Sequence, residues 1–261
     1  MNRDAVRQTA TITTFVLTIV VNALANILPI NGRNTGQISD SFANFFVPAG
    51  YVFGIWSIIY LGLLAFVVYQ ALPAQRENKL LREIGPWFIG SNLLNAVWIL
   101  AWHYSLVPLS LLIMLGLLGC LLVIYTILDR NRSEARGAWR WLVNPTFSLY
   151  LGWITVATII NVSVTLISVG WDGFGISGEV WAVALLVIGT IIGALVALPR
   201  RDWLYAVVLV WAFFGIGVKF AALPLLANAA YIAAAVAAVI VLLNLFRNLN
   251  SGGGVRRAAQ A

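Results

Sequence analysis

The chain has 261 residues, of which 61% are hydrophobic and only 10% are charged, with a formal net charge of +7 at pH 7. About a quarter of the residues in soluble domains are charged, so this composition excludes an ordinary soluble domain. The positive charge does not indicate a nucleic-acid partner. The cations lie in short gaps between apolar stretches, where their neighbours are anionic lipid headgroups.

Eight apolar stretches occupy most of the chain, and each comes close to the roughly 20 residues that a helix needs to cross a bilayer. They cover residues 8–30, 48–71, 86–104, 107–128, 142–168, 179–198, 203–220 and 223–246. A β-barrel would show shorter segments of alternating polarity. The chain is therefore predicted to be an all-α integral membrane protein with about eight transmembrane helices. Its prolines, including Pro29, Pro86 and Pro199, fall at or near span ends, so no helix is predicted to break in mid-membrane.

The distribution of cations predicts the orientation. Placing the N-terminus in the cytoplasm puts 14 of the 16 Lys and Arg residues on that side and leaves Arg33 and Lys219 outside. The inside group is Arg3, Arg7, Arg76, Lys79, Arg82, Arg130, Arg132, Arg136, Arg140, Arg200, Arg201, Arg247, Arg256 and Arg257. Cytoplasmic loops carry an excess of Lys and Arg, so we expect a protein of the cell membrane with both termini in the cytoplasm. Residues 1–25 also resemble a cleaved signal peptide, but their apolar region is longer than a signal core, and we expect them to be retained.

Three spans carry faces that combine aromatic and polar side chains. At about 100° per residue, each of the following sets falls on one side of its helix. The sets are Phe53, Trp56, Ser57 and Tyr60; Asn92, Asn95, Trp98 and Trp102; and Tyr150, Trp153, Ala157 and Asn161. With a rise of about 1.5 Å per residue, these faces could meet in the outer half of the bundle, beneath the loop 30–47. A loop of this length is often functional, for instance as a lid, and disorder is the alternative interpretation. Such a cavity suits a flat, largely apolar ligand, and ordinary packing between helices is the alternative interpretation.

No catalytic constellation is visible in the sequence. All nine acidic residues map to loops or span ends, and no metal-ligand cluster or nucleophile motif appears. His103 lies at the outer end of its span, where we expect water or headgroups to satisfy it. Lys219 is expected to extend to the interface, with Asp172 or Glu179 as an alternative partner. Cys120 lies inside a span, which excludes a disulfide within the chain and indicates packing. The chain is therefore not expected to be an enzyme or to hold a metal.

Three of these segments resemble the TspO/MBR family of tryptophan-rich sensory proteins, which includes the translocator protein. Residues 48–62, PAGYVFGIWSIIYLG, resemble its second-helix signature. Asn95 and Trp98 in LLNAVWILAW resemble its third-helix pattern, and LYLGWITVATIIN resembles its fifth-helix signature. The sequence departs from the family where Pro48 stands without a second proline and where Leu149 replaces a proline.

The resemblance implies a five-helix fold with a ligand cavity beneath the loop that joins the first two helices. Family ligands include porphyrins and other tetrapyrroles, and sterols in animal members. The matching positions here are Phe53, Trp56, Tyr60, Asn95, Trp98, Tyr150, Trp153, Ala157 and Asn161.

The resemblance also implies a division of the chain. Residues 1–168 would form the TspO/MBR-like bundle, residues 169–246 three additional transmembrane helices, and residues 247–261 a flexible cytoplasmic tail. Three roles are open for the additional helices: widening the bundle, forming a homodimer, or adding a separate function.

The leading hypothesis is a multi-pass membrane protein that binds a tetrapyrrole-like or other flat apolar ligand for sensing or transport. No cofactor is required, and a porphyrin or haem-like molecule is the expected kind of ligand. The first alternative is a small-molecule transporter, which needs a polar path across the whole membrane, whereas polar residues concentrate in one half. The second alternative is a membrane enzyme acting on lipid or isoprenoid substrates, which lacks a catalytic cluster.

Overall fold

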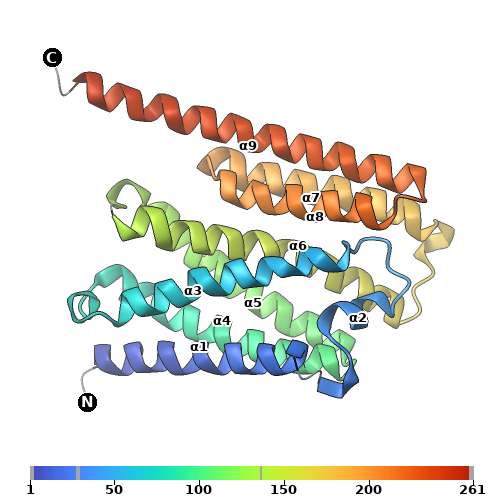
Figure 1. The fold of residues 1–261 in the computed structure, drawn as a ribbon, viewed down its shortest axis with the longest axis horizontal. Coiled ribbons are helices and arrows are strands. Elements are labelled where there is room, and N and C mark those ends of the chain that lie inside the picture. The colour runs from blue at the N-terminus through green and yellow to red at the C-terminus, as the bar shows by residue number, and fades with distance from the viewer. Residues whose placement is uncertain (1–2, 28–29, 136, 259–261) are drawn as a thin grey trace.

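The computed structural model of the protein describes residues 3–27, 30–135 and 137–258. In this part of the chain the regular structure is entirely helical, and the long helices run alongside one another in a single bundle (Figure 1). They are α1 (Arg3–Ile27), α3 (Ile55–Ala71), α4 (Lys79–His103), α5 (Val107–Arg130), α6 (Asn144–Ser168), α7 (Gly178–Arg200), α8 (Trp203–Lys219) and α9 (Pro224–Ala258). The short helix α2 (Thr35–Asp40) lies between α1 and α3; a 3-10 turn (Gly50–Gly54) leads into α3 and a π-helical turn (Trp139–Val143) into α6.

Length and composition confirm the prediction of a helical membrane protein. Seven helices of the described chain, two of them counted with the short turns that precede them, are long and apolar enough to cross a membrane. The eighth, α8, has 17 residues. At 1.5 Å per residue it spans about 26 Å, slightly less than the roughly 30 Å of a hydrocarbon core. It packs against α6, α7 and α9, so protein surrounds much of it.

Both ends of the chain lie at the same end of the bundle, and α2 lies at the opposite end (Figure 1). The connections at residues 72–78, 131–138 and 201–202 share the end with the termini, which we call the inner end. It holds most of the cations, whereas Lys219 and Arg33 lie at the other, outer end. Arg136 lies outside the described residues.

Several helix boundaries differ from the predicted ones, most of all the start of α4 and the end of α9. Helix α4, which corresponds to the third predicted span, begins at Lys79 instead of residue 86. The Asn78 side chain accepts hydrogen bonds from the Leu80 and Leu81 amides and so caps the helix. Pro86 therefore lies within α4, and Pro199 within the last turn of α7. Pro29 lies outside the described residues. α9 continues through residue 258, and residues 259–261 lie outside the described chain.

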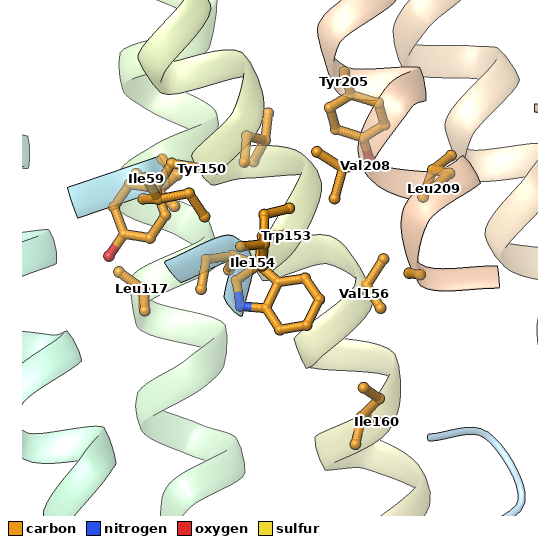
Figure 2. Packing of buried hydrophobic residues seen from close by; sticks show 14 of the residues in the cluster. Ile59, Leu117, Tyr150, Trp153, Ile154, Val156, Ile160, Tyr205, Val208 and Leu209 are labelled. Atoms are coloured by element: carbon orange, nitrogen blue, oxygen red, sulfur yellow. The ribbon is translucent and has the colours of Figure 1, made fainter. Parts of the chain in front are cut away.

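Helix α6 forms the centre of the bundle. Figure 2 shows Ile59 and Leu117 beside Tyr150 on one side of α6, and residues of α8, among them Val208, on the other. Gly152 permits this close approach, because a Cβ at this position would lie 3.1 Å from the Val208 side chain. Helix α8 is therefore packed directly against α6, and α7 and α9 pack against α8.

A group of hydrogen bonds at the inner end also joins α8 to α5 and α6. Asp202 Oδ2 accepts hydrogen bonds from Tyr125 Oη and Ser148 Oγ, both at 2.6 Å, and Oδ1 accepts one from the Tyr205 amide at 3.1 Å. Bonds to an ionised acceptor are stronger than neutral ones. One carboxylate therefore connects α5, α6 and α8.

Candidate functional site

A cavity of about 690 Å³ lies at the outer end, between α1 and α3 and beneath α2. Its size falls within the range of about 300–1,000 Å³ that is usual for ligand sites. The lining residues come from α1, from α2 and its cap, from the start of α3, and from α4. They are Ile19, Asn22, Ala23, Asn26, Ile27, Asn34, Thr35, Gly36, Gln37, Asp40, Gly50, Phe53, Trp56, Ser57, Tyr60 and Ile99.

The cover of this cavity is an ordered helix. Asn34 and Gln37 form a reciprocal capping box at the start of α2, which satisfies two amides that a helix leaves free. Thr35 Oγ1 donates a hydrogen bond to Asn26 Oδ1 at 3.2 Å, and Trp102 Nε1 donates one to the Thr35 carbonyl at 3.3 Å. These contacts attach the cover to α1 and α4.

The cover is also attached to α8, in the second half of the chain. Lys219, at the end of α8, forms an ion pair with Asp40 of α2. The alternative prediction that Lys219 pairs with Asp172 or Glu179 is therefore wrong, whereas its extension to the interface stays a prediction. The fold brings the loop 30–47 over α8, and the Asp40 carboxylate is nearer.

Three predicted residues line the cavity directly: Phe53, Trp56 and Tyr60. Trp56 stacks on Tyr60 with ring centroids 5.1 Å apart and 19° between the planes. Behind them lie Trp153, whose ring centroid is 5.6 Å from that of Phe53, and Tyr150, 5.9 Å from Trp56. Residues of α3, of the turn that precedes it and of α6 thus form one aromatic wall. Two of the three predicted aromatic faces therefore lie together.

Asn95 and Trp98 belong to a deeper layer. Asn95 Oδ1 accepts a hydrogen bond from Asn22 Nδ2 at 2.8 Å, and its Nδ2 donates one to Tyr150 Oη at 3.1 Å. Trp98 stacks on Trp102 with centroids 5.7 Å apart. Asn95 therefore links the α1 side of the cavity to the residues behind the aromatic wall.

Ala157 and Asn161 are not brought to the cavity. Asn161 Nδ2 donates a hydrogen bond to Ser110 Oγ of α5 at 3.0 Å, and neither Ala157 nor Asn161 lines the cavity. For Asn161, the geometry is that of ordinary packing between helices. The predicted face of α6 therefore does not reach the cavity at its outer part, where Asn161 contacts α5.

The polar lining from α1 and α2 was missed from the sequence. Asn22 and Asn26 of α1 and Gln37 and Asp40 of α2 line the cavity, together with Ser57 of α3, which the predicted face of that helix already included. The buried face of α1 carries a signal that could have revealed its part, because Gln8, Thr11, Thr18 and Asn22 recur at helical spacing.

Three buried donors near the cavity have no hydrogen-bond partner in the described chain: Tyr60 Oη, Trp98 Nε1 and Trp153 Nε1. A buried donor without an acceptor costs about 1–3 kcal/mol. Tyr60 lines the cavity and Trp153 packs directly behind it. Acceptor atoms of a ligand or of water could satisfy donors in these positions.

Polar contacts also continue towards the inner end along the seam between α1 and α4. Thr18 Oγ1 donates to the Asn92 carbonyl at 2.9 Å, and Asn92 Nδ2 donates to Thr14 Oγ1 at 3.3 Å. Near the inner end, Gln8 Nε2 donates to the Gln70 carbonyl at 2.6 Å. The expectation that polar residues concentrate in one half of the membrane is therefore wrong, because α1 turns its polar face inward along its length.

His103 is buried instead of solvated. It has no exposed surface, its Nδ1 lies 2.8 Å from the Ile99 carbonyl, and its Nε2 has no partner. The prediction of water or headgroup contact is wrong, because the loop that leaves α1 passes over this end of α4, where Asn31 donates to the His103 carbonyl. The described residues contain no group of three or more His, Cys, Asp or Glu able to hold a metal ion.

These features define a class: a helical protein of the membrane with an aromatic-walled cavity beneath a helical cover. Within this class, the chain belongs to the TSPO-like family, since the family model described as TSPO-like protein matches residues 8–243. The match continues past residue 168, where the motif resemblance ended, and takes in α7, α8 and most of α9. No curated protein and no solved structure matches the chain significantly.

Proposed function

We propose that the protein binds a tetrapyrrole-like or other flat, largely apolar ligand in the cavity beneath α2, for sensing or transport. The observation that carries this proposal is the wall of Phe53, Trp56 and Tyr60, backed by Tyr150 and Trp153. Aromatic rings favour offset stacking and edge contacts with another flat ring system.

The remaining lining suits the edge of such a ligand. The Asn26 and Gln37 amide groups line the cavity, and the Tyr60 hydroxyl is a buried donor without a partner among the described residues. A flat molecule with carbonyl or carboxylate groups on its rim would place its plane against the aromatic wall and its acceptors against these donors. The proposed role is binding, in which the residues orient the ligand.

Titration with protoporphyrin, followed by tryptophan fluorescence, tests this proposal. Trp56→Ala should weaken binding about tenfold, since a lost aromatic contact is worth about 1 kcal/mol beyond burial. The matched control is Trp141→Ala, because Trp141 is 76% exposed and lies at the inner end. Equal affinities of Trp56→Ala and the unaltered protein would contradict the proposal, as would an equal loss in the control.

We further propose that the inner end faces the cytoplasm, so that the cavity opens towards the outer half of the membrane. The support is the gathering of cations at the end that holds both termini. A cysteine introduced at Arg33, in a chain whose Cys120 is replaced by Ala, should react with an impermeant maleimide added to intact cells. Labelling only after lysis would reverse the orientation.

The seam between α1 and α4 supports a second candidate, a small-molecule transporter. Along this seam Thr11 Oγ1 and Asn92 Oδ1, with Gln70 Oε1 beside it, are buried polar atoms without partners. Buried polar groups are normally paired, so atoms of this kind mark positions for water or for a passing polar solute. Ligand-dependent flux in proteoliposomes that Asn92→Leu abolishes would favour transport over binding alone.

A further inference from the structure

A second cavity, of about 320 Å³, lies at the inner end, far from the aromatic wall. It is formed where the start of α4, the end of α5 and the start of α6 meet. Its lining residues are Asn78, Lys79, Leu80, Glu83, Leu128, Asn131, Ala135, Trp139 and Asn144. The proposed function does not use this cavity.

Two opposite charges lie on its wall. Lys79 and Glu83 are one helical turn apart on α4, and no ion pair joins either of them to another of the residues whose side chains the structure describes. Lys placed four residues before Glu is the less favourable order for a pair within a helix. Both charges are therefore available to a ligand that carries a negative and a positive group a few ångströms apart.

A third polar group defines the positive end of such a ligand. Asn144 lines the cavity, and its Oδ1 is buried without a hydrogen-bond partner. This oxygen can only accept, so the matching ligand atom must carry a hydrogen. An ammonium group with N–H bonds satisfies both this acceptor and Glu83, whereas a trimethylammonium group offers no such donor.

The position of the cavity along the helices indicates which kind of molecule carries these two charged groups. It lies at the inner ends of the helices, and Trp139 on its wall is a residue type favoured at headgroup depth. Basic side chains in pockets between helices on the cytoplasmic side bind lipid headgroups, and Lys79 has this place in the orientation proposed above. We propose that this cavity binds the headgroup of a zwitterionic phospholipid, phosphatidylethanolamine, with its phosphate at Lys79 and its ammonium group at Glu83 and Asn144.

Native mass spectrometry of the full-length, delipidated protein tests the proposal. Phosphatidylethanolamine, phosphatidylcholine and phosphatidylglycerol with identical acyl chains would be added in competition. Phosphatidylethanolamine should bind about tenfold more tightly than either, the difference expected for one charge-assisted hydrogen bond. Tightest binding of phosphatidylglycerol would overturn the proposal, because it would indicate attraction to the general positive charge. Glycerophosphoethanolamine that competes as well as the lipid would overturn the assignment to a lipid.

Three variants should give three different patterns. Lys79→Gln should weaken all three lipids, because each contains a phosphate, whereas Glu83→Gln should spare phosphatidylglycerol, which has no cationic group. Asn144→Leu should weaken phosphatidylethanolamine alone and so remove most of its preference over phosphatidylcholine, and Asn144→Asp should restore it. The control is Glu77→Gln, an exposed residue of the preceding loop that does not line the cavity. Identical behaviour of the Asn144→Leu variant and this control would refute the proposed contact.

Discussion

Replacing Asn95 by Leu removes the polar link between α1 and the residues behind the aromatic wall while keeping a side chain of similar size. Asn95 is fully buried, accepts from Asn22 Nδ2 at 2.8 Å and donates to Tyr150 Oη at 3.1 Å. Leu can replace neither bond. Tyr150 then loses the group that orients its hydroxyl, and its ring forms an edge contact with Trp56.

The expected loss of stability follows from these two bonds. Hydrogen bonds between membrane helices contribute about 0.6 kcal/mol on average and up to about 1.7 kcal/mol, so two bonds amount to about 1–3 kcal/mol. Unfolding in mixed micelles with increasing dodecyl sulfate, followed by circular dichroism, measures this difference. In a double-mutant cycle, Asn22→Leu and Asn95→Leu should show a coupling of about 0.6 kcal/mol.

Asn161→Leu is the matched control for ligand binding. Asn161 is also buried and loses a bond to Ser110 at 3.0 Å, but its partner is on α5, whereas Asn95 bonds to the lining residue Asn22 and to Tyr150 behind the aromatic wall. Both variants should be less stable, whereas only Asn95→Leu should lower the affinity for protoporphyrin, by several-fold. Unchanged stability of Asn95→Leu, or an equal loss of affinity in Asn161→Leu, would refute this reasoning.

Two further predictions concern the contact between the first five helices and the last three. Asp202→Asn removes the charge that strengthens the 2.6 Å bond from Tyr125 Oη, so it should lower the free energy of unfolding by about 1–2 kcal/mol in the same micelle assay; an unchanged midpoint would contradict this. Gly152→Leu should cost about 1–3 kcal/mol by overpacking, because a Cβ there already lies 3.1 Å from Val208. Gly119→Leu, where a Cβ meets nothing within 4 Å, is its control, and an equal loss in both variants would disprove a close α6–α8 contact.

The aromatic part of the site could be predicted because its periodicity is a local property. Phe53, Trp56 and Tyr60 lie on one face of a helix wherever that helix is placed, and the same holds for Tyr150 and Trp153. The residues that α1 and α2 contribute could not be found in this way. Their place at the cavity depends on how those helices dock against α3 and α4.

The surroundings of Lys219 and His103 could not be predicted from the sequence either. Each lies at the outer end of a span, where water and headgroups are the natural partners of a polar side chain. The loop 30–47 folds over both helix ends, so Lys219 meets Asp40 and His103 is covered. A pattern within one helix carries no information about a loop more than 50 residues away in sequence.

The sequence by itself determined that the chain is a bundle of membrane-crossing helices, because apolar length and the placement of cations are properties of each segment alone. It also determined which faces of three helices carry rings and amides. Only the tertiary structure decided that α8 supports the cover of the outer cavity and that Asn161 faces α5. It likewise decided that Lys79, Glu83 and Asn144 line one cavity at the inner end. These outcomes depend on which helices become neighbours, and that choice is made by side-chain packing and hydrogen bonding across the whole bundle.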